Sequence, residues 1–537
     1  MSTTIAPDAA GIRLPVSAAA HVARHREERP RRRPVTTVAT AFGVLAVALF
    51  LRLFHLASSY DLFIDETTYT AIARDTTLGA GPLLHGMPFV LHPPLALLLL
   101  AGPARLLATQ DTAALVDGLR PFVAVTGALI AALVYLVLRQ SGFRRYALVG
   151  AAVVALDPLI VSFDSRVMLE AFAQLFAVLA IAAAVRAVTA PPASRGRWSL
   201  LTAVAGAATI ATKETFGIVV LVTLVLVALT ATRGQRRWPL AAVGGTLLGY
   251  GLVNVAMIDW AGLGLWWHMR TDGLMRLLGL QQSTGFKAEG VEHSFWERVL
   301  PNGAELGGTY AVLVLGGLSA LSLLWRVLRR HETVTTLPPT GRSAARIVAI
   351  WAVCACGYVG YAVVFGSLEE QMFYIAAVPC VAALMIRSAI ARRSVRRIAA
   401  FGIALVLLAQ AFAWFSVHTA RDDVYSQMLE QLPRVVAPDS TIAVTEETAQ
   451  FVLNGYDLGQ WVTVPDLQAN AVDYVLLSDR LVEYGYGLAD GDFAAEVRAN
   501  GTRVLSIQGR ENDLQLYDVR EWTGSAVDST APSGDES

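Results

Sequence analysis

Apolar segments of membrane length recur along most of this chain and constrain its fold more than any other feature. A helix needs about 17 to 25 apolar residues to cross the hydrocarbon layer of a bilayer. Inside lipid only helices and closed barrels satisfy their backbone hydrogen bonds. We count about eleven such segments, at residues 36–57, 121–138, 145–163, 168–189, 197–213, 216–232, 238–260, 307–328, 344–365, 370–388 and 396–416. The sequence therefore predicts a mainly α, polytopic membrane helical bundle.

The composition agrees with a membrane environment and excludes one class of partner. Of 537 residues, 55% are hydrophobic and 16% are charged, and the formal net charge is +0. Because nucleic-acid binding requires a basic surplus, we expect no nucleic-acid partner. Cys354, Cys356 and Cys380 lie in apolar segments without redox or zinc spacing, which predicts small buried hydrophobic side chains.

Clusters of arginine predict how the chain is oriented, since short basic loops stay in the cytoplasm. Such clusters occupy every second loop, matching the basic residues 1–35, which we expect to form a disordered cytoplasmic tail. This alternation of basic loops is consistent only if residues 90–108, which are apolar but short, stay at the outer interface and do not cross the membrane. The predicted membrane domain, residues 36–418, then has outer loops at 58–108 and 261–306.

Beyond the last span the chain becomes polar and is predicted to lie outside the cell membrane. Runs rich in strand-forming residues, at 441–444, 474–477 and 514–517, alternate with helix-like stretches. They predict a small extracytoplasmic α/β domain over residues 419–525. Residues 526–537, rich in Ser, Gly, Asp and Pro, are expected to be disordered.

Several polar motifs share the predicted outer side. They are Ile64-Asp65-Glu66, His92-Pro93-Pro94-Leu95, Ser165-Arg166-Val167-Met168-Leu169-Glu170 and Thr212-Lys213-Glu214, followed by Arg270 in the second outer loop. Ionisable groups near bilayer depth are costly and usually persist because they have a function. The motifs therefore predict chemistry at the outer membrane surface.

In their order and spacing these motifs resemble the GT-C superfamily of membrane glycosyltransferases. The similarity is to protein O-mannosyltransferases and aminoarabinose transferases of the glycosyltransferase family 39 type, and it covers residues 40–230 well. It implies a multi-pass enzyme of the cell membrane that moves a sugar, with mannose one candidate, from a polyprenyl-phosphate carrier to an extracytoplasmic acceptor with inversion. Whether the acceptor is a protein, a lipid or a glycan stays open.

That reaction assigns roles to the acidic pair. An inverting displacement needs one carboxylate to accept the proton of the attacking hydroxyl, and Asp65 is our candidate base. Glu66 is the second catalytic candidate: it orients the acceptor, helps to bind a cation, or only caps a helix that we expect to begin at Thr67.

The basic residues are candidates for binding the substrate. Arg166 presents a planar fork of donors suited to phosphate, with Glu170 positioning it or the sugar, although residues four apart also form intrahelical ion pairs. Lys213 contacts phosphate or sugar, or else pairs with Glu214 or reaches the interface. His92 donates to phosphate, binds a metal or merely starts a helix. Arg270 is a further phosphate candidate.

The sequence leaves a divalent metal open and makes no cofactor certain. In the aminoarabinose branch an acidic residue precedes the lysine of the Pro-Pro segment and helps to hold a metal, whereas this chain has Leu91 followed by His92. The candidate ligands Glu66, His92, His268 and His293 lack compact spacing.

Two other functional classes compete with an enzyme. A transporter or flippase of lipid-linked saccharides would share the spans but predicts paired repeats and charges near the midplane; we find no clear repeat, and the charges gather on one side. A non-catalytic assembly protein would tolerate Asp65→Asn. Glu369-Glu370 and Tyr484-Gly485-Tyr486-Gly487 are further candidates for contact with the cavity and the acceptor.

Overall fold

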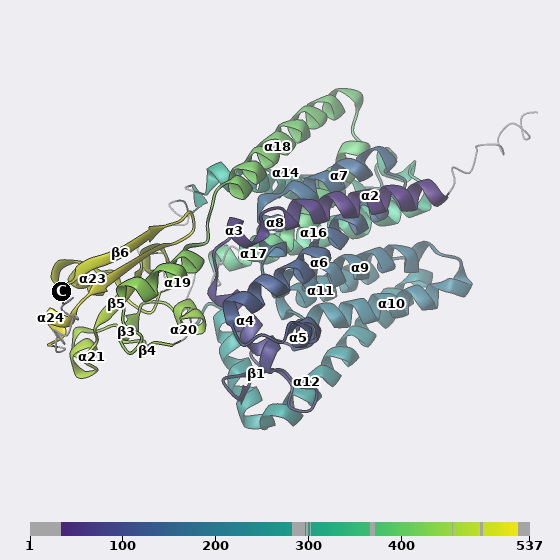
Figure 1. The fold of residues 1–537 in the computed structure, drawn as a ribbon. Helices are drawn as coiled ribbons and strands as arrows, with labels where there is room; N and C mark the ends of the chain where they lie inside the picture. Colours follow the sequence, from purple (N-terminus) through teal and green to yellow (C-terminus); the bar gives the residue numbers. More distant parts are fainter. Residues whose placement is uncertain are drawn as a thin grey trace, which may run out of the picture.

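The computed structural model describes residues 34–281, 296, 299–300, 302–365, 371–453, 455–483 and 487–524. The two predicted tails lie outside these residues, except for Pro34 and Val35 at the start of the first helix. A bundle of long helices carries a small mixed α/β domain at one end (Figure 1). The predicted fold class, a helical membrane bundle with a C-terminal α/β domain, is confirmed.

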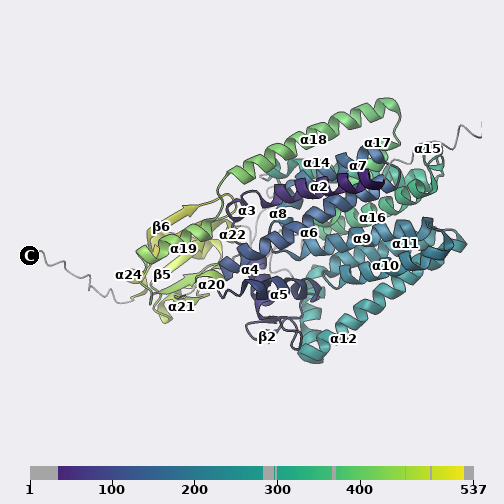
Figure 2. The ribbon, with the colours of Figure 1, turned by 45° about the vertical axis from the view of Figure 1, so that its right-hand side comes forward.

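Within the described residues, eight helices are long and apolar enough to cross a membrane. They are α2 (Pro34–Leu53), α6 (Thr112–Gln140), α9 (Leu169–Thr189), α12 (Arg233–Leu277), α14 (Gly303–Leu328), α16 (Pro339–Val364), α17 (Gln371–Ala389) and α18 (Arg393–Thr419). Helices α12 and α18 form opposite edges of the bundle in both views (Figures 1 and 2).

The predicted count of eleven spans is not confirmed, because three predicted spans have other forms. The segment 145–163 is a broken pair, α7 (Arg144–Leu156) and α8 (Pro158–Asp164), bent by 62°. Pro158 lacks the backbone N–H that would continue α7, and Asp157 caps the new helix by accepting from the Ile160 N–H at 3.2 Å. If this pair is one span, the described count becomes nine. The polar start of α10 (Pro192–Ile210) and the shortness of α11 (Glu214–Thr230) leave both outside that count.

The described parts of the two predicted outer loops contain several helices. Residues 58–108 contain α3 (Leu56–Ser59) in part, α4 (Ile64–Asp75), the hairpin β1 (Leu83–Leu84) and β2 (Met87–Pro88), and α5 (Leu95–Leu107). Residues 261–277 continue α12 beyond a kink at Gly262, whose φ of 75° suits glycine. The part of the second predicted outer loop from residue 261 to Leu277 is therefore helical. A short helix, α15 (Glu332–Thr335), joins α14 to α16.

A buried ion pair fixes the end of α8, from which the next polar motif extends. Arg52 of α2 donates to Asp164 at 2.7 and 3.0 Å, and the hydroxyl of Tyr374 on α17 donates to the same carboxylate at 2.5 Å. Gly127 of α6 leaves room for this carboxylate, since a Cβ there would fall 2.3 Å from it. Buried charges persist when paired and hydrogen-bonded, so this cluster holds the start of the 165–168 segment in place.

The C-terminal domain is a five-stranded sheet with the order β4-β3-β5-β7-β6. Its strands are β3 (Thr441–Val444), β4 (Asp457–Gly459), β5 (Tyr474–Ser478), β6 (Thr502–Gln508) and β7 (Asp513–Asp518). Strand β3 is parallel to β4 and β5, whereas β7 is antiparallel to β5 and β6. The predicted strands match β3, β5 and β7, while β4 and β6 were missed. The helices are α19 (Val424–Val435), α20 (Thr448–Val452), α21 (Val464–Ala469), α22 (Asp479–Glu483), α23 (Gly491–Asn500) and α24 (Arg520–Thr523).

This domain and the first predicted outer loop, residues 58–108, share a hydrophobic core. Tyr69 of α4 and Leu97 of α5 belong to one buried cluster with Tyr425 and Met428 of α19 and Ile442 of β3. Burial of such side chains contributes about 1.5 to 3 kcal/mol each. The sheet domain is therefore packed onto α4, which carries the acidic pair, and onto α5.

Candidate active site

The acidic pair lies in the first turn of α4, where the partial positive charge of the helix start favours carboxylates. The helix begins at Ile64, not at the predicted Thr67. Glu66 is fully buried and uses both oxygens: it accepts from Arg120 at 2.9 and 2.8 Å and from the Val167 N–H at 2.8 Å. This geometry suits a group that fixes α4 to α6 and to the 165–168 segment.

Asp65 differs from its neighbour in accessibility. It is only half-buried, whereas Glu66 has no exposed surface. Tyr69 lies one turn further along α4, on the same face as Asp65, and its ring centroid is 6.0 Å from that of His92. Of the pair, Asp65 is therefore the carboxylate that a hydroxyl group can reach.

Two basic side chains next to His92 are each paired with the first acid of a helix. Lys213 donates to Glu170, at the start of α9, and to Gln371 at 2.7 Å. Arg270 donates to Glu214, at the start of α11, and to the Leu91 carbonyl at 3.2 Å. The kink in α12 thus brings a residue of the second predicted outer loop against the first.

The two local ion pairs that were the alternatives to a role in the site, Arg166–Glu170 and Lys213–Glu214, do not form. Arg166 precedes α9, which starts at Leu169 after an extended Met168, so Arg166 and Glu170 do not share a helix face. Lys213 is itself extended before α11, and its partner is Glu170 and not Glu214. Each basic residue instead pairs with an acid from another segment.

The pKa of His92 reflects the positive charge of this region. It is half-buried, and burial together with the positive charges of Lys213 and Arg270 lowers the pKa of His92 to about 3. The ring is therefore neutral at ordinary pH and can donate one N–H but cannot act as a cation. The surrounding potential is positive, which suits an anionic group.

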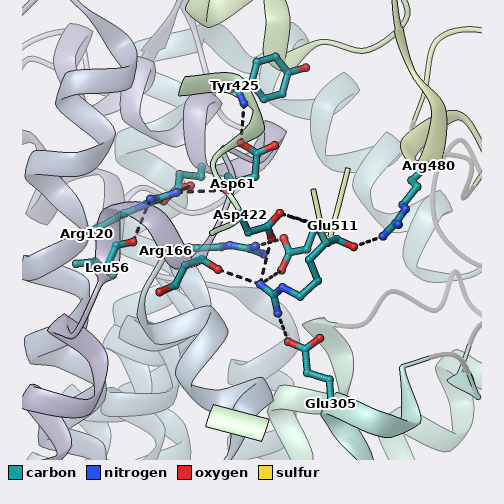
Figure 3. Close-up of polar contacts among 12 residues, drawn as sticks. Leu56, Asp61, Arg120, Arg166, Glu305, Asp422, Tyr425, Arg480 and Glu511 are labelled. Carbon is teal, nitrogen blue, oxygen red and sulfur yellow. Dashed lines mark hydrogen bonds and ion pairs between the residues drawn. The ribbon is translucent and has the colours of Figure 1, made fainter. Parts of the chain in front are cut away.

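Arg166 lies in a second cluster, formed together with the C-terminal domain (Figure 3). Its guanidinium donates to Glu511 in the turn between β6 and β7, and it lies 4.9 Å from the ring of Tyr60. Arg510 lies on the same ring at 5.6 Å and donates to Asp422 at 3.2 Å. Although burial opposes ionisation, Arg166 and Arg510 lower the pKa of Glu511 below its ordinary value.

Asp61 adds a carboxyl group of different character to this cluster. It accepts from the Tyr425 N–H at 3.0 Å, and its other oxygen is buried without a hydrogen-bond partner among the described residues. Burial, reinforced by the charge of Asp422, raises the pKa of Asp61 well above its ordinary value. Asp61 therefore tends to stay protonated, next to carboxylates that are ionised by arginine partners.

The metal question stays open. Among the described residues no group of three or more His, Cys, Asp or Glu side chains is arranged to hold a metal. His268 is exposed and lies 3.4 Å from Asp272. His293, Glu369, Glu370, Tyr484 and Tyr486 lie outside the described residues.

Comparison with known proteins finds one family that is similar to part of the chain. Residues 44–272 match the family described as dolichyl-phosphate-mannose-protein mannosyltransferase, and this range contains every predicted site residue from Asp65 to Arg270. No curated protein sequence matches the chain.

The fold is shared with solved membrane proteins. ArnT from Cupriavidus metallidurans, bound to undecaprenyl phosphate, is 14% identical with a TM-score of 0.54, over 90% of this chain and 97% of that one. The oligosaccharyltransferase of Archaeoglobus fulgidus, in complex with zinc and sulfate, is 12% identical with a TM-score of 0.50, over 91% of this chain and 74% of that one. At these identities the likeness is one of fold, and the family match adds the sequence evidence. Residues 44–272 thus resemble the protein mannosyltransferase family in sequence, and the chain as a whole shares the fold of ArnT.

Proposed function

We propose that this glycosyltransferase moves a sugar from a polyprenyl-phosphate carrier to a hydroxyl group of an acceptor on the extracytoplasmic side, with inversion at the anomeric carbon. One juxtaposition carries the proposal. Asp65 shares a helix face with Tyr69, whose ring contacts His92, and His92 lies in the positive field of Lys213 and Arg270. An accessible carboxylate thus lies beside a region suited to phosphate, as a displacement from a sugar phosphate requires.

The chemistry follows from these positions. Asp65 accepts the proton of the acceptor hydroxyl, while the hydroxyl oxygen forms a bond to the anomeric carbon. The bond from that carbon to the phosphate oxygen breaks on the opposite face, and its electron pair leaves with the carrier phosphate. Lys213, Arg166 and Arg270 stabilise the charge that develops there. A single carboxylate suffices, because the phosphate is already a good leaving group.

The acids that surround the site have supporting roles in this proposal. Glu66 fixes the first turn of α4 through Arg120 and so sets the position of Asp65. Glu170 and Glu214 orient Lys213 and Arg270. Mannose is the sugar suggested by the name of the matching family, and undecaprenyl phosphate is the carrier bound by ArnT.

The test is a transfer assay on the purified full-length chain in lipid nanodiscs. We would supply a panel of radiolabelled polyprenyl-phosphate sugars, with and without a chelator, and measure transfer or slow hydrolysis. Turnover of one donor identifies the sugar, and its loss with chelator reveals a metal. If no donor is turned over and vesicles containing the protein instead move the intact lipid-linked sugar between leaflets, the transporter alternative replaces the proposal.

A further inference from the structure

The turn between β6 and β7 brings two charged residues of the C-terminal domain into the cluster around Arg166 (Figure 3). Arg510 anchors the turn: its guanidinium donates to Asp422 at 3.2 Å, to the Ser59 carbonyl at 2.9 Å and to Glu305. The Arg510 N–H also donates to Asp422 at 2.8 Å. The turn is therefore held by Arg510, independently of the residue that follows it.

Glu511, the next residue, bridges the two arginines. It accepts from Arg166 and, with its other oxygen, from Arg510 at 3.1 Å. The Nε of Arg166 is buried and has no hydrogen-bond partner among the described residues. One carboxylate oxygen thus leaves part of the Arg166 fork unused, whereas a phosphate can satisfy such a fork with two oxygens.

Glu511 is also the most releasable of the four carboxylates that hold the basic residues. The exposed fraction of its side chain is 33%, against 24% for Glu214, 1% for Glu170 and 0% for Glu66. The other three belong to the first turns of helices in the bundle, while Glu511 belongs to a turn of the sheet domain. If Glu511 leaves Arg166, its bond to Arg510 keeps it from becoming an unpaired charge.

We propose that Glu511 is an internal competitor of the carrier phosphate: it holds Arg166 until the donor lipid binds, gives way to the phosphate, and returns as the product lipid departs. The proposal rests on the proposed function, in which Arg166 contacts that phosphate. It makes the C-terminal domain a regulator of carrier affinity and of product release, acting through Arg166.

The experiment measures equilibrium binding of undecaprenyl phosphate to the full-length chain in nanodiscs, for the parent and for Glu511→Gln. Loss of a charge-assisted competing bond should lower the Kd of the variant about tenfold. Glu305→Gln is the matched control, because it removes a carboxylate from the same cluster without touching Arg166, and its Kd should stay within about twofold of the parent. In an Arg166→Gln background, Glu511→Gln should no longer change the Kd.

A second variant separates competition from charge and from misfolding. Glu511→Asp keeps the charge but shortens the reach to Arg166 by one methylene, so its Kd should fall in the same direction. An unchanged or higher Kd in folded Glu511→Gln and Glu511→Asp overturns the proposal, as does equal tightening by Glu305→Gln. If the parent itself fails to bind the lipid, the proposed function fails as well, which distinguishes that outcome from failure of the competitor alone.

Discussion

Replacing each carboxylate in the first turn of α4 by its amide should have different effects: loss of activity at Asp65 and loss of stability at Glu66. Asp65→Asn is nearly isosteric and removes one acid from a helix start, which costs about 0.3 to 1 kcal/mol of the free energy of unfolding. It abolishes proton acceptance, so we expect the rate of sugar transfer to fall about 10² to 10⁴-fold with binding of the donor largely retained.

Glu66→Gln should instead act on stability. The substitution removes the buried ionic partner of Arg120, whose side chain is 1% exposed, and leaves it only the half-exposed Asp117, 3.4 Å away. It also weakens the 2.8 Å hydrogen bond that the Val167 N–H donates to this side chain. Breaking one partner of a buried pair costs about 3 to 5 kcal/mol, several times the cost expected at Asp65.

The assay compares both variants in one preparation. Unfolding would be followed by intrinsic fluorescence in detergent, and transfer and donor binding would be measured on the folded fraction alone. If Asp65→Asn transfers sugar at near the parent rate while folded Glu66→Gln is inactive, the base is misassigned by one residue. If both variants stay active, the displacement mechanism itself is wrong.

Three further outcomes follow from the structure. Arg166→Lys keeps the charge but loses the fork, so the Kd for undecaprenyl phosphate should rise about tenfold in a folded protein; an unchanged Kd would leave Arg166 only as the partner of Glu511. In a chain whose three native cysteines are replaced by alanine, Asn500→Cys should react with an impermeant thiol reagent in intact cells, whereas Arg145→Cys should not. Both positions are exposed, and the opposite result would mean that the predicted membrane orientation is inverted. The pKa of His92 is about 3 in the folded chain but near 6.5 in the unfolded chain, so between these pH values only the unfolded chain binds the proton. The free energy of unfolding should therefore fall by up to about 1.4 kcal/mol for each unit by which the pH decreases. His92→Gln should flatten that slope, and an unchanged slope would contradict the assigned environment.

The helical bundle was predictable, and the motifs of the candidate site were recognisable, because their signals are local. Membrane-length apolar runs, arginine-rich loops and short motifs such as Asp65-Glu66 can be recognised within a few residues. The same evidence could not count spans, because a break such as Asp157-Pro158 looks apolar overall. Strand β6 was missed because four of its seven residues are polar and exposed.

The pairing of the charges was beyond the sequence. Arg120 borders an apolar run and resembles a residue at the end of a span, yet it is the partner of Glu66. Arg510 and Glu511 lie in an ordinary polar turn, more than three hundred residues from Arg166 along the chain. Since pairing depends on the tertiary fold, spacing could offer only the local pairs Arg166–Glu170 and Lys213–Glu214 as alternatives to a site role, and neither pair forms.

The pairing has a physical cause that bears on the mechanism. Lys213, Arg166 and Arg270 are mostly buried near the end of an apolar bundle, where an unpaired cation would be expensive, and each is paired with a carboxylate. Under the proposed function, a carrier phosphate would therefore bind by exchange, replacing a carboxylate as it enters. The gain from binding is then the difference between two charge-assisted interactions, which keeps the carrier affinity moderate. In the proposed reaction the product lipid retains the same phosphate, so that difference would also let the product leave.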